Sequence, residues 1–287
     1  MSYQNERELK VSYLSKEECR CPVCDTAFRR EELLTGGGRM IAGPLTDELH
    51  RVYEGSVKYG DVYPLAYPPT VCPECWFASD DKDFVALPRE SIDRVMDDRS
   101  RRIADIELIF PSVDFNSPRD LVSGAAAQYL VMRCYDFYPK EFSPTIKQGI
   151  AVIRASWLLE DMDKKYPGQH YDWIAKLFKM KAQFFYNEAL FREQSGKETL
   201  SGLKNFGPDI DKNYSYEGML YLTGLLQMKY GPRNDGDKRT ELLREAKRTI
   251  AKIFGLGRSS KAKPGPLLEK ARELYDSLNK ELNEIDE

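Results

Sequence analysis

The sequence predicts a mainly α-helical protein that begins with a small module of short β-strands. Strand-like alternation surrounds two cysteine pairs in residues 1–86, and from Pro88 onward the apolar residues recur with a period of about 3.6 instead of two. The chain has 287 residues, of which 41% are hydrophobic and 31% are charged. This balance favours a helical protein with much surface, and the length suffices for a sizeable core.

Four of the six cysteines form two pairs with one internal pattern, Cys21-Pro22-Val23-Cys24 and Cys72-Pro73-Glu74-Cys75. Two residues between thiols let a tight turn aim both sulfurs at one point, and the proline pre-shapes that turn. Two such turns supply the four tetrahedral ligands that Zn²⁺ prefers. We therefore predict that Cys21, Cys24, Cys72 and Cys75 bind one structural zinc ion. Iron in the same thiolate cage is the less favoured metal, and disulfides or free thiols are the alternatives to a metal.

Short strands are expected before each pair, as in a zinc ribbon. Val11 and Tyr13 alternate ahead of the first pair, and the runs 62–63 and 65–67 lead into the second. The segment 46–55 between the pairs is predicted to be either a helix or an ordered excursion.

Two cysteines lie outside the pairs, and neither of the two histidines has a partner at metal-binding or catalytic spacing. Cys19 is an alternate ligand or, as we favour, an unused thiol, and Cys134 is expected to be a small core residue. His50 and His170 are expected to be structural. Four thiolates would close a zinc site, and no phosphate loop, HExxH or GxSxG motif is present, so we do not expect an enzyme. A hydrolase using Asp80–Asp83 or an open metal site is the least favoured alternative.

The first predicted helix spans Ile92 to Ile106 and ends near Phe110-Pro111, followed by a hinge at 111–116. Ser117-Pro118 then supplies an N-cap and a first helical residue for the next helix. Five further helices carry apolar stripes, with a long polar connection at 195–213: Ile146–Trp157, Ile174–Phe185, Met219–Tyr230, Leu243–Ile253 and Leu267–Leu282. We divide the chain into a metal-binding module (1–86), a connecting helix and hinge (87–116) and a helical domain (117–287).

The helical domain is predicted to stack antiparallel helix pairs, either as a tetratricopeptide-like solenoid or as a plain bundle. Ala182, Tyr186 and Ala189 have the small–aromatic–small spacing of a tetratricopeptide second helix, and Ala246, Ile250 and Ile253 match it less well. The helix lengths vary, and the rest of the repeat signature is missing. Both arrangements therefore stay open.

These features together resemble an uncharacterised bacterial family, catalogued as a domain of unknown function and common in Firmicutes and spirochaetes. The similarity covers most of the chain, including the glycine-rich excursion after the first pair, the run Tyr63-Pro64-Leu65-Ala66-Tyr67 before the second, and the segment Tyr221–Leu226. The resemblance implies that Cys21, Cys24, Cys72 and Cys75 are metal-binding positions. It implies no activity, because the family has none established.

The chain departs from the usual zinc-knuckle pattern just after each pair. Asp25 and Trp76 stand where glycine commonly adopts a left-handed conformation. Asp tolerates this conformation, whereas Trp does so less readily. We therefore expect the second knuckle to be distorted.

Charge and composition favour an interaction protein. The net charge of −3 and the pI near 5.7 argue against a bulk nucleic-acid binder. No apolar run reaches the length of about 18 residues that a membrane helix needs, so no membrane insertion is expected. The polar N-terminus lacks the apolar core of a secretory signal, which predicts a cytoplasmic location.

We predict a cytoplasmic scaffold or adaptor whose helical domain binds a protein or peptide. The 17 tyrosines suit such recognition, although helix packing would also use them. The alternative is nucleic-acid binding through the ribbon and the basic region 229–263, which holds 11 basic and 4 acidic residues for a net charge of +7. A solvated helical face with a loop at 258–263 would explain that charge equally well.

Overall fold

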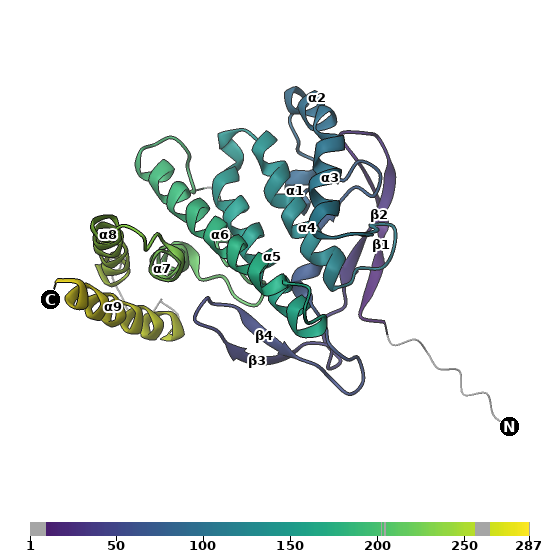
Figure 1. The fold of residues 1–287 in the computed structure, drawn as a ribbon. Helices are drawn as coiled ribbons and strands as arrows, with labels where there is room; N and C mark the ends of the chain where they lie inside the picture. The colour runs from purple at the N-terminus through teal and green to yellow at the C-terminus, as the bar shows by residue number, and fades with distance from the viewer. Residues whose placement is uncertain (1–9, 202, 204, 256–264, 287) are drawn as a thin grey trace.

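The computed structural model describes residues 10–201, 203, 205–255 and 265–286 (Figure 1). Within these residues the protein is mainly helical, with three small antiparallel sheets formed by residues before the second helix. The buried core runs from the cysteine pairs to the last helix. No described helix has both the length and the apolar character to cross a membrane.

Two of the sheets carry the cysteine pairs at their turns. Strand β1 (Ser12–Arg20) pairs with β2 (Ala27–Leu33), and β5 (Pro69–Val71) pairs with β6 (Ala78–Asp80). Each pair therefore follows a strand, as predicted. The run 62–67 forms a 3₁₀ turn, η1 (Pro64–Ala66), rather than a strand. Prolines flank and begin this turn, and proline cannot donate a ladder hydrogen bond.

The excursion between the pairs is a β-hairpin. Strand β3 (Ile41–Leu45) pairs with β4 (Arg51–Glu54), so the segment 46–55 holds the hairpin turn and the second strand, not a helix. In Figure 1 this hairpin lies beneath the long helices α5 and α6, on a different side of the molecule from β1 and β2.

The first predicted helix is broken. It consists of α2 (Arg89–Asp97) and α3 (Arg99–Ile109), after the short α1 (Asp81–Phe84). The break falls at Asp98, whose carboxylate lies 3.1 Å from Arg102 and 3.6 Å from Arg133. Two cations, one at each carboxylate oxygen, hold the corner between the helices.

Helix α4 (Leu121–Cys134) begins at Leu121, not at Pro118 as predicted. The side chain of Asp120 accepts the N–H of Ser123, and the Ser123 hydroxyl accepts the N–H of Asp120. This reciprocal capping box is stronger than a lone serine cap, because it satisfies two backbone donors. Within the segment 111–116, Phe115 packs edge-to-face on Trp76 with ring centroids 5.2 Å apart, and the hinge at this segment stays a prediction.

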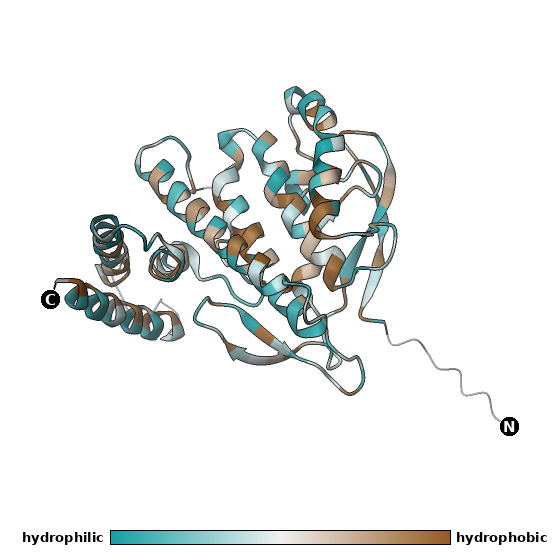
Figure 2. Cartoon of the chain, viewed as in Figure 1, coloured by the Kyte–Doolittle hydropathy of each residue, from teal (hydrophilic) through white to brown (hydrophobic). Residues whose placement is uncertain are grey.

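The five later helices occupy the predicted places, and each packs on the next: α5 (Pro144–Lys165), α6 (Tyr171–Gln194), α7 (Ser215–Tyr230), α8 (Gly236–Gly255) and α9 (Gly265–Asp286). Figure 2 shows hydrophobic residues gathered where α4, α5 and α6 lie together. The α5 helix is buried on nearly all sides, and Gly149 lets it approach the ring of Tyr186 on α6.

The apolar stripe predicted for α6 divides into two faces. Phe178 and Phe185 are buried against the neighbouring helices, whereas Leu177 and Phe184 are exposed. Because α6 is apolar on two faces, the neighbouring helices cover one face and leave the other exposed. Leu177 and Phe184 thus belong to the predicted apolar stripe but face solvent.

Candidate metal centre

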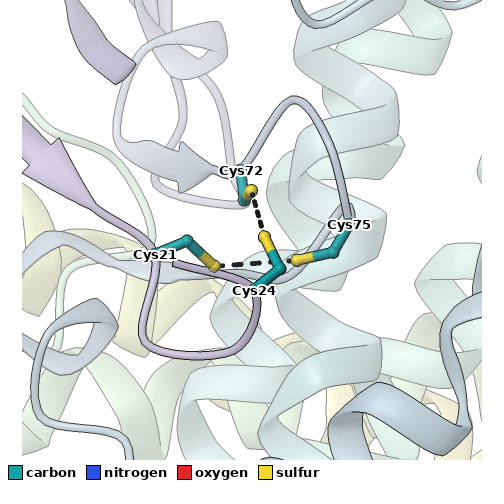
Figure 3. A group of neighbouring side chains, drawn as sticks. All are labelled: Cys21, Cys24, Cys72 and Cys75. Carbon is teal, nitrogen blue, oxygen red and sulfur yellow. Dashed lines mark hydrogen bonds between the residues drawn. The ribbon is translucent and has the colours of Figure 1, made fainter. Parts of the chain in front are cut away.

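The two cysteine pairs converge on one point (Figure 3). The sulfurs of Cys21, Cys24, Cys72 and Cys75 all lie within 4.8 Å of one another. The Sγ atoms of Cys21 and Cys75 are 3.6 Å apart, and those of Cys24 and Cys72 are 3.5 Å apart. A tetrahedron with Zn–S bonds of about 2.3 Å has S···S edges of about 3.8 Å. The four sulfurs therefore fit a metal ion such as zinc, and they are too far apart for disulfides, whose S–S bond is about 2.05 Å.

The two knuckles share one backbone pattern. The N–H of Cys21 donates to the carbonyl of Thr26 (2.9 Å), and the N–H of Asp25 donates to the carbonyl of Cys21 (3.0 Å). In the second knuckle, the N–H of Cys72 donates to the carbonyl of Phe77 (2.9 Å), and that of Trp76 donates to the carbonyl of Cys72 (3.0 Å).

The predicted distortion of the second knuckle is absent. Asp25 and Trp76 adopt left-handed φ values of 61° and 55°. For a residue with a side chain this conformation costs about 1–2 kcal/mol. The edge-to-face contact between Trp76 and Phe115 contributes about 0.5–1.5 kcal/mol and offsets that cost.

The cluster is buried, and its thiols shift one another's pKa values in opposite directions. Cys21, Cys72 and Cys75 are at most 1% exposed, and Cys24 is half-buried. Hydrogen bonds from Cys21 and Cys75, and then from backbone amides, lower the pKa of the Cys72 thiol to about 2. The bond to Cys72 raises the pKa of Cys21 to about 12, and the bond to Cys21 raises that of Cys75. Metal binding requires thiolates, so a metal that binds here would release protons.

The second knuckle rests on the helices through a buried arginine. Arg102 of α3 is fully buried, and it donates to the carbonyls of Cys75 (2.8 Å) and Val95 (3.0 Å). Sequence reasoning missed this residue. The sequence did offer a signal, because Arg102 lies on the same helix face as the apolar Val95 and Ile106. A cation buried on such a face needs several hydrogen-bond acceptors.

The remaining cysteines lie outside the cluster. Cys19 pairs with Phe28 in the β1–β2 ladder and does not belong to the group of four sulfurs. Cys134 is buried at the end of α4, where its sulfur accepts the N–H of Ala78 (3.4 Å). This bond joins the second knuckle to α4, and burial raises the pKa of the Cys134 thiol to about 11.

The turn between β3 and β4 inserts a carboxylate among the long helices. Glu48 accepts the indole N–H of Trp157 on α5 (2.6 Å) and the hydroxyl of Tyr230 on α7 (3.0 Å). The ammonium of Lys179 on α6 lies 3.1 Å from Glu48 and also pairs with Glu160. We call Glu48, Trp157, Lys179 and Tyr230 the Glu48 clasp. Burial would lower the pKa of Lys179, but the two carboxylates outweigh it and raise that pKa.

His50 lies beside the clasp and has structural contacts. Its Nδ1 is 2.6 Å from Oδ2 of Asp209, and its ring stacks on Trp157 with centroids 4.3 Å apart. Asp209 is fully buried and also accepts the N–H of Arg51 (2.8 Å). Burial would raise the pKa of Asp209, but the His50 bond and the backbone donors hold it below its usual value. His170 is an exposed residue that precedes α6.

Comparison with known proteins agrees with the predicted resemblance. The model of a family described as "Uncharacterized protein conserved in bacteria (DUF2225)" matches residues 14–278. An uncharacterized protein of Borreliella burgdorferi is 39% identical over 277 residues, which cover 96% of this chain and 99% of that protein. No solved structure matches the chain. The chain belongs to the DUF2225 family of uncharacterized bacterial proteins.

Proposed function

We propose that this protein is a non-enzymatic, zinc-stabilised interaction protein, a scaffold or adaptor of the cytoplasm. Four thiolates would fill the coordination sphere of zinc and leave no position for a substrate water. Bound zinc would supply structural cross-linking of the two knuckles. A reducing compartment suits this chemistry, because it disfavours disulfides. Iron fits the same donor set and is the less favoured metal.

The observation that carries the interaction role is an exposed apolar row on α6. It consists of five large side chains, each between 44% and 57% exposed: Trp173, Leu177, Met180, Phe184 and Phe191. We call this set the α6 row. Soluble monomers rarely expose a contiguous apolar surface of this kind unless another molecule covers it. We infer that the α6 row docks a protein.

A tetratricopeptide-like arrangement is part of the proposal. Ala182, Tyr186 and Ala189 lie buried on the opposite face of α6, where α5 packs against it. This burial supports a reading of α5 and α6 as one antiparallel pair, in which the small residues permit close packing. A plain bundle would present the same α6 row to a partner.

Nucleic-acid binding is the second candidate. Arg244, Lys247 and Arg248 line a cavity of about 450 Å³ between α8 and α9, beside Tyr275 and Asn279. Basic side chains at a cavity suit phosphate groups. The loop 258–263 that sequence reasoning added to this surface lies outside the described residues.

The interaction role is tested with a photoreactive amino acid at position 184 of the full chain, expressed in cells. The same group at Val57, an exposed position in the loop after β4, is the control. We expect a cross-linked protein from position 184 and none from position 57. Equal products from both positions, or none from either, would refute the role. Fluorescence anisotropy with labelled RNA and DNA tests the second candidate, which requires binding that weakens steeply with salt.

A further inference from the structure

We propose that the protein which covers the α6 row is a second copy of this chain, with the two α6 helices packed antiparallel across a two-fold axis. This inference rests on the proposed function, because it names the partner of the same surface. The argument uses the spacing of the row, its symmetry and its area.

The row has the spacing of a helix–helix seam. Its members follow one another at alternating intervals of four and three residues from Trp173 to Phe184, and Asn187 fills the next place before Phe191. Intervals of four and three keep side chains on one face of a helix and are those of a coiled-coil seam. The seam faces solvent, whereas Ala175, Ala182 and Ala189 point into the protein's own core.

The places of the row are symmetric about the level of Ala182 on the helix, and the pairs that this symmetry creates are apolar except for Leu177 with Asn187. If two copies pack antiparallel with the axis on the solvent face between Met180 and Phe184, Trp173 of one copy meets Phe191 of the other, and Met180 meets Phe184. A two-fold interface requires this property, since each residue pair must occur twice with the roles exchanged. The antiparallel arrangement thereby sets an aromatic side chain against an apolar or aromatic one in two of the three kinds of contact.

The area of the row suffices for a specific dimer. A large side chain of this kind buries about 200 Å², so five that are half exposed offer about 500 Å² per copy. Two copies would bury about 1,000 Å², which is near the lower limit of specific interfaces. The exposed Lys176 and Lys181 flank the row and would form part of the polar rim that such interfaces have.

The first test measures the oligomeric state of the full chain by sedimentation, with a matched pair of variants. Phe184→Lys places a charge beside the axis in both copies, so we expect its dimerisation constant to weaken by about a thousandfold. Leu108→Lys makes the same kind of change at an exposed apolar residue of α3 and should leave the dimer intact. Circular dichroism and metal content confirm that both variants fold.

The second test determines the direction of packing. A photoreactive group at Trp173 of the purified protein should attach near Phe191 of the other copy, whereas parallel packing would attach it near Trp173. A monomeric wild-type protein, a dimer that survives Phe184→Lys, or parallel attachment would overturn the inference. If the protein is monomeric but position 184 captures a different protein in cells, the inference fails while the proposed function stands. If nothing is captured either, both fail.

Discussion

The buried carboxylate of Glu48 links the β3–β4 hairpin to three helices, and we predict that its removal destabilises the protein. The change Glu48→Ala removes the acceptor of Trp157 and Tyr230 and one of the two carboxylates beside Lys179. Glu48 is 4% exposed, so water cannot replace it without opening the structure. The substitution should therefore destabilise the whole molecule and not only the hairpin.

The expected loss follows from the contacts. A hydrogen bond to a charged group contributes about 1.5–3 kcal/mol, and Trp157 and Tyr230 each lose one. Lys179 keeps its pair with Glu160 and adds little. We therefore expect the free energy of unfolding to fall by about 3–6 kcal/mol. This is a large part of the 5–15 kcal/mol that is typical of a folded domain.

Urea unfolding followed by circular dichroism measures this loss. Glu54→Ala is the control, because Glu54 is an exposed residue of the same hairpin and should change stability by less than about 0.5 kcal/mol. A loss below about 1 kcal/mol for Glu48→Ala would refute the clasp as a stabilising element.

The division into segments 1–86 and 117–287 stays a prediction. Two separate unfolding transitions in the wild-type protein would show that these segments fold independently.

Three further predictions concern the metal centre and the buried acid. Elemental analysis should find one zinc ion per chain; Cys72→Ser should abolish it and Cys19→Ser should not, whereas no metal in the wild-type protein would exclude the four-cysteine site. The pKa of Asp209 is lower in the folded state than in the unfolded chain. The ionised Asp209 therefore stabilises the fold above the ordinary pKa of an aspartate, and this stabilisation is lost as the pH falls through the lower, folded-state pKa. Asp209→Asn should remove that part of the acid dependence of unfolding, and an unchanged profile would contradict it. Asp25→Gly should raise thermal stability by up to about 1 kcal/mol, whereas Trp76→Gly should lower it through loss of the Phe115 contact; equal effects would refute the assigned offset.

Local patterns predicted much of the fold. The five helices from α5 to α9 were predictable because each carries its own apolar periodicity and its own end signals. The convergence of Cys21, Cys24, Cys72 and Cys75 was predictable because each tight turn aims two sulfurs at one point, and two turns suffice for a tetrahedral set.

Contacts between distant residues were not predictable in the same way. Glu48 meets Trp157 across 109 positions of the chain and Tyr230 across 182, and neither neighbourhood records its partner. The exposure of Phe184 was missed for a related reason. Periodicity shows that a residue lies on an apolar face, but only the packing of neighbouring helices decides which of two such faces is covered.

The arrangement of the helices separates the metal centre from the α6 row. The second knuckle rests on α4 through Cys134, α4 packs on α5, and α5 packs on α6 (Figure 1). A metal bound to the cysteines would thus stabilise the layer of helices on which α6 packs. The Glu48 clasp holds α5, α6 and α7 together through side chains outside the cysteine cluster. Both features stabilise the packing of the helices, so the proposed metal would act on the proposed binding surface by maintaining the fold that presents it.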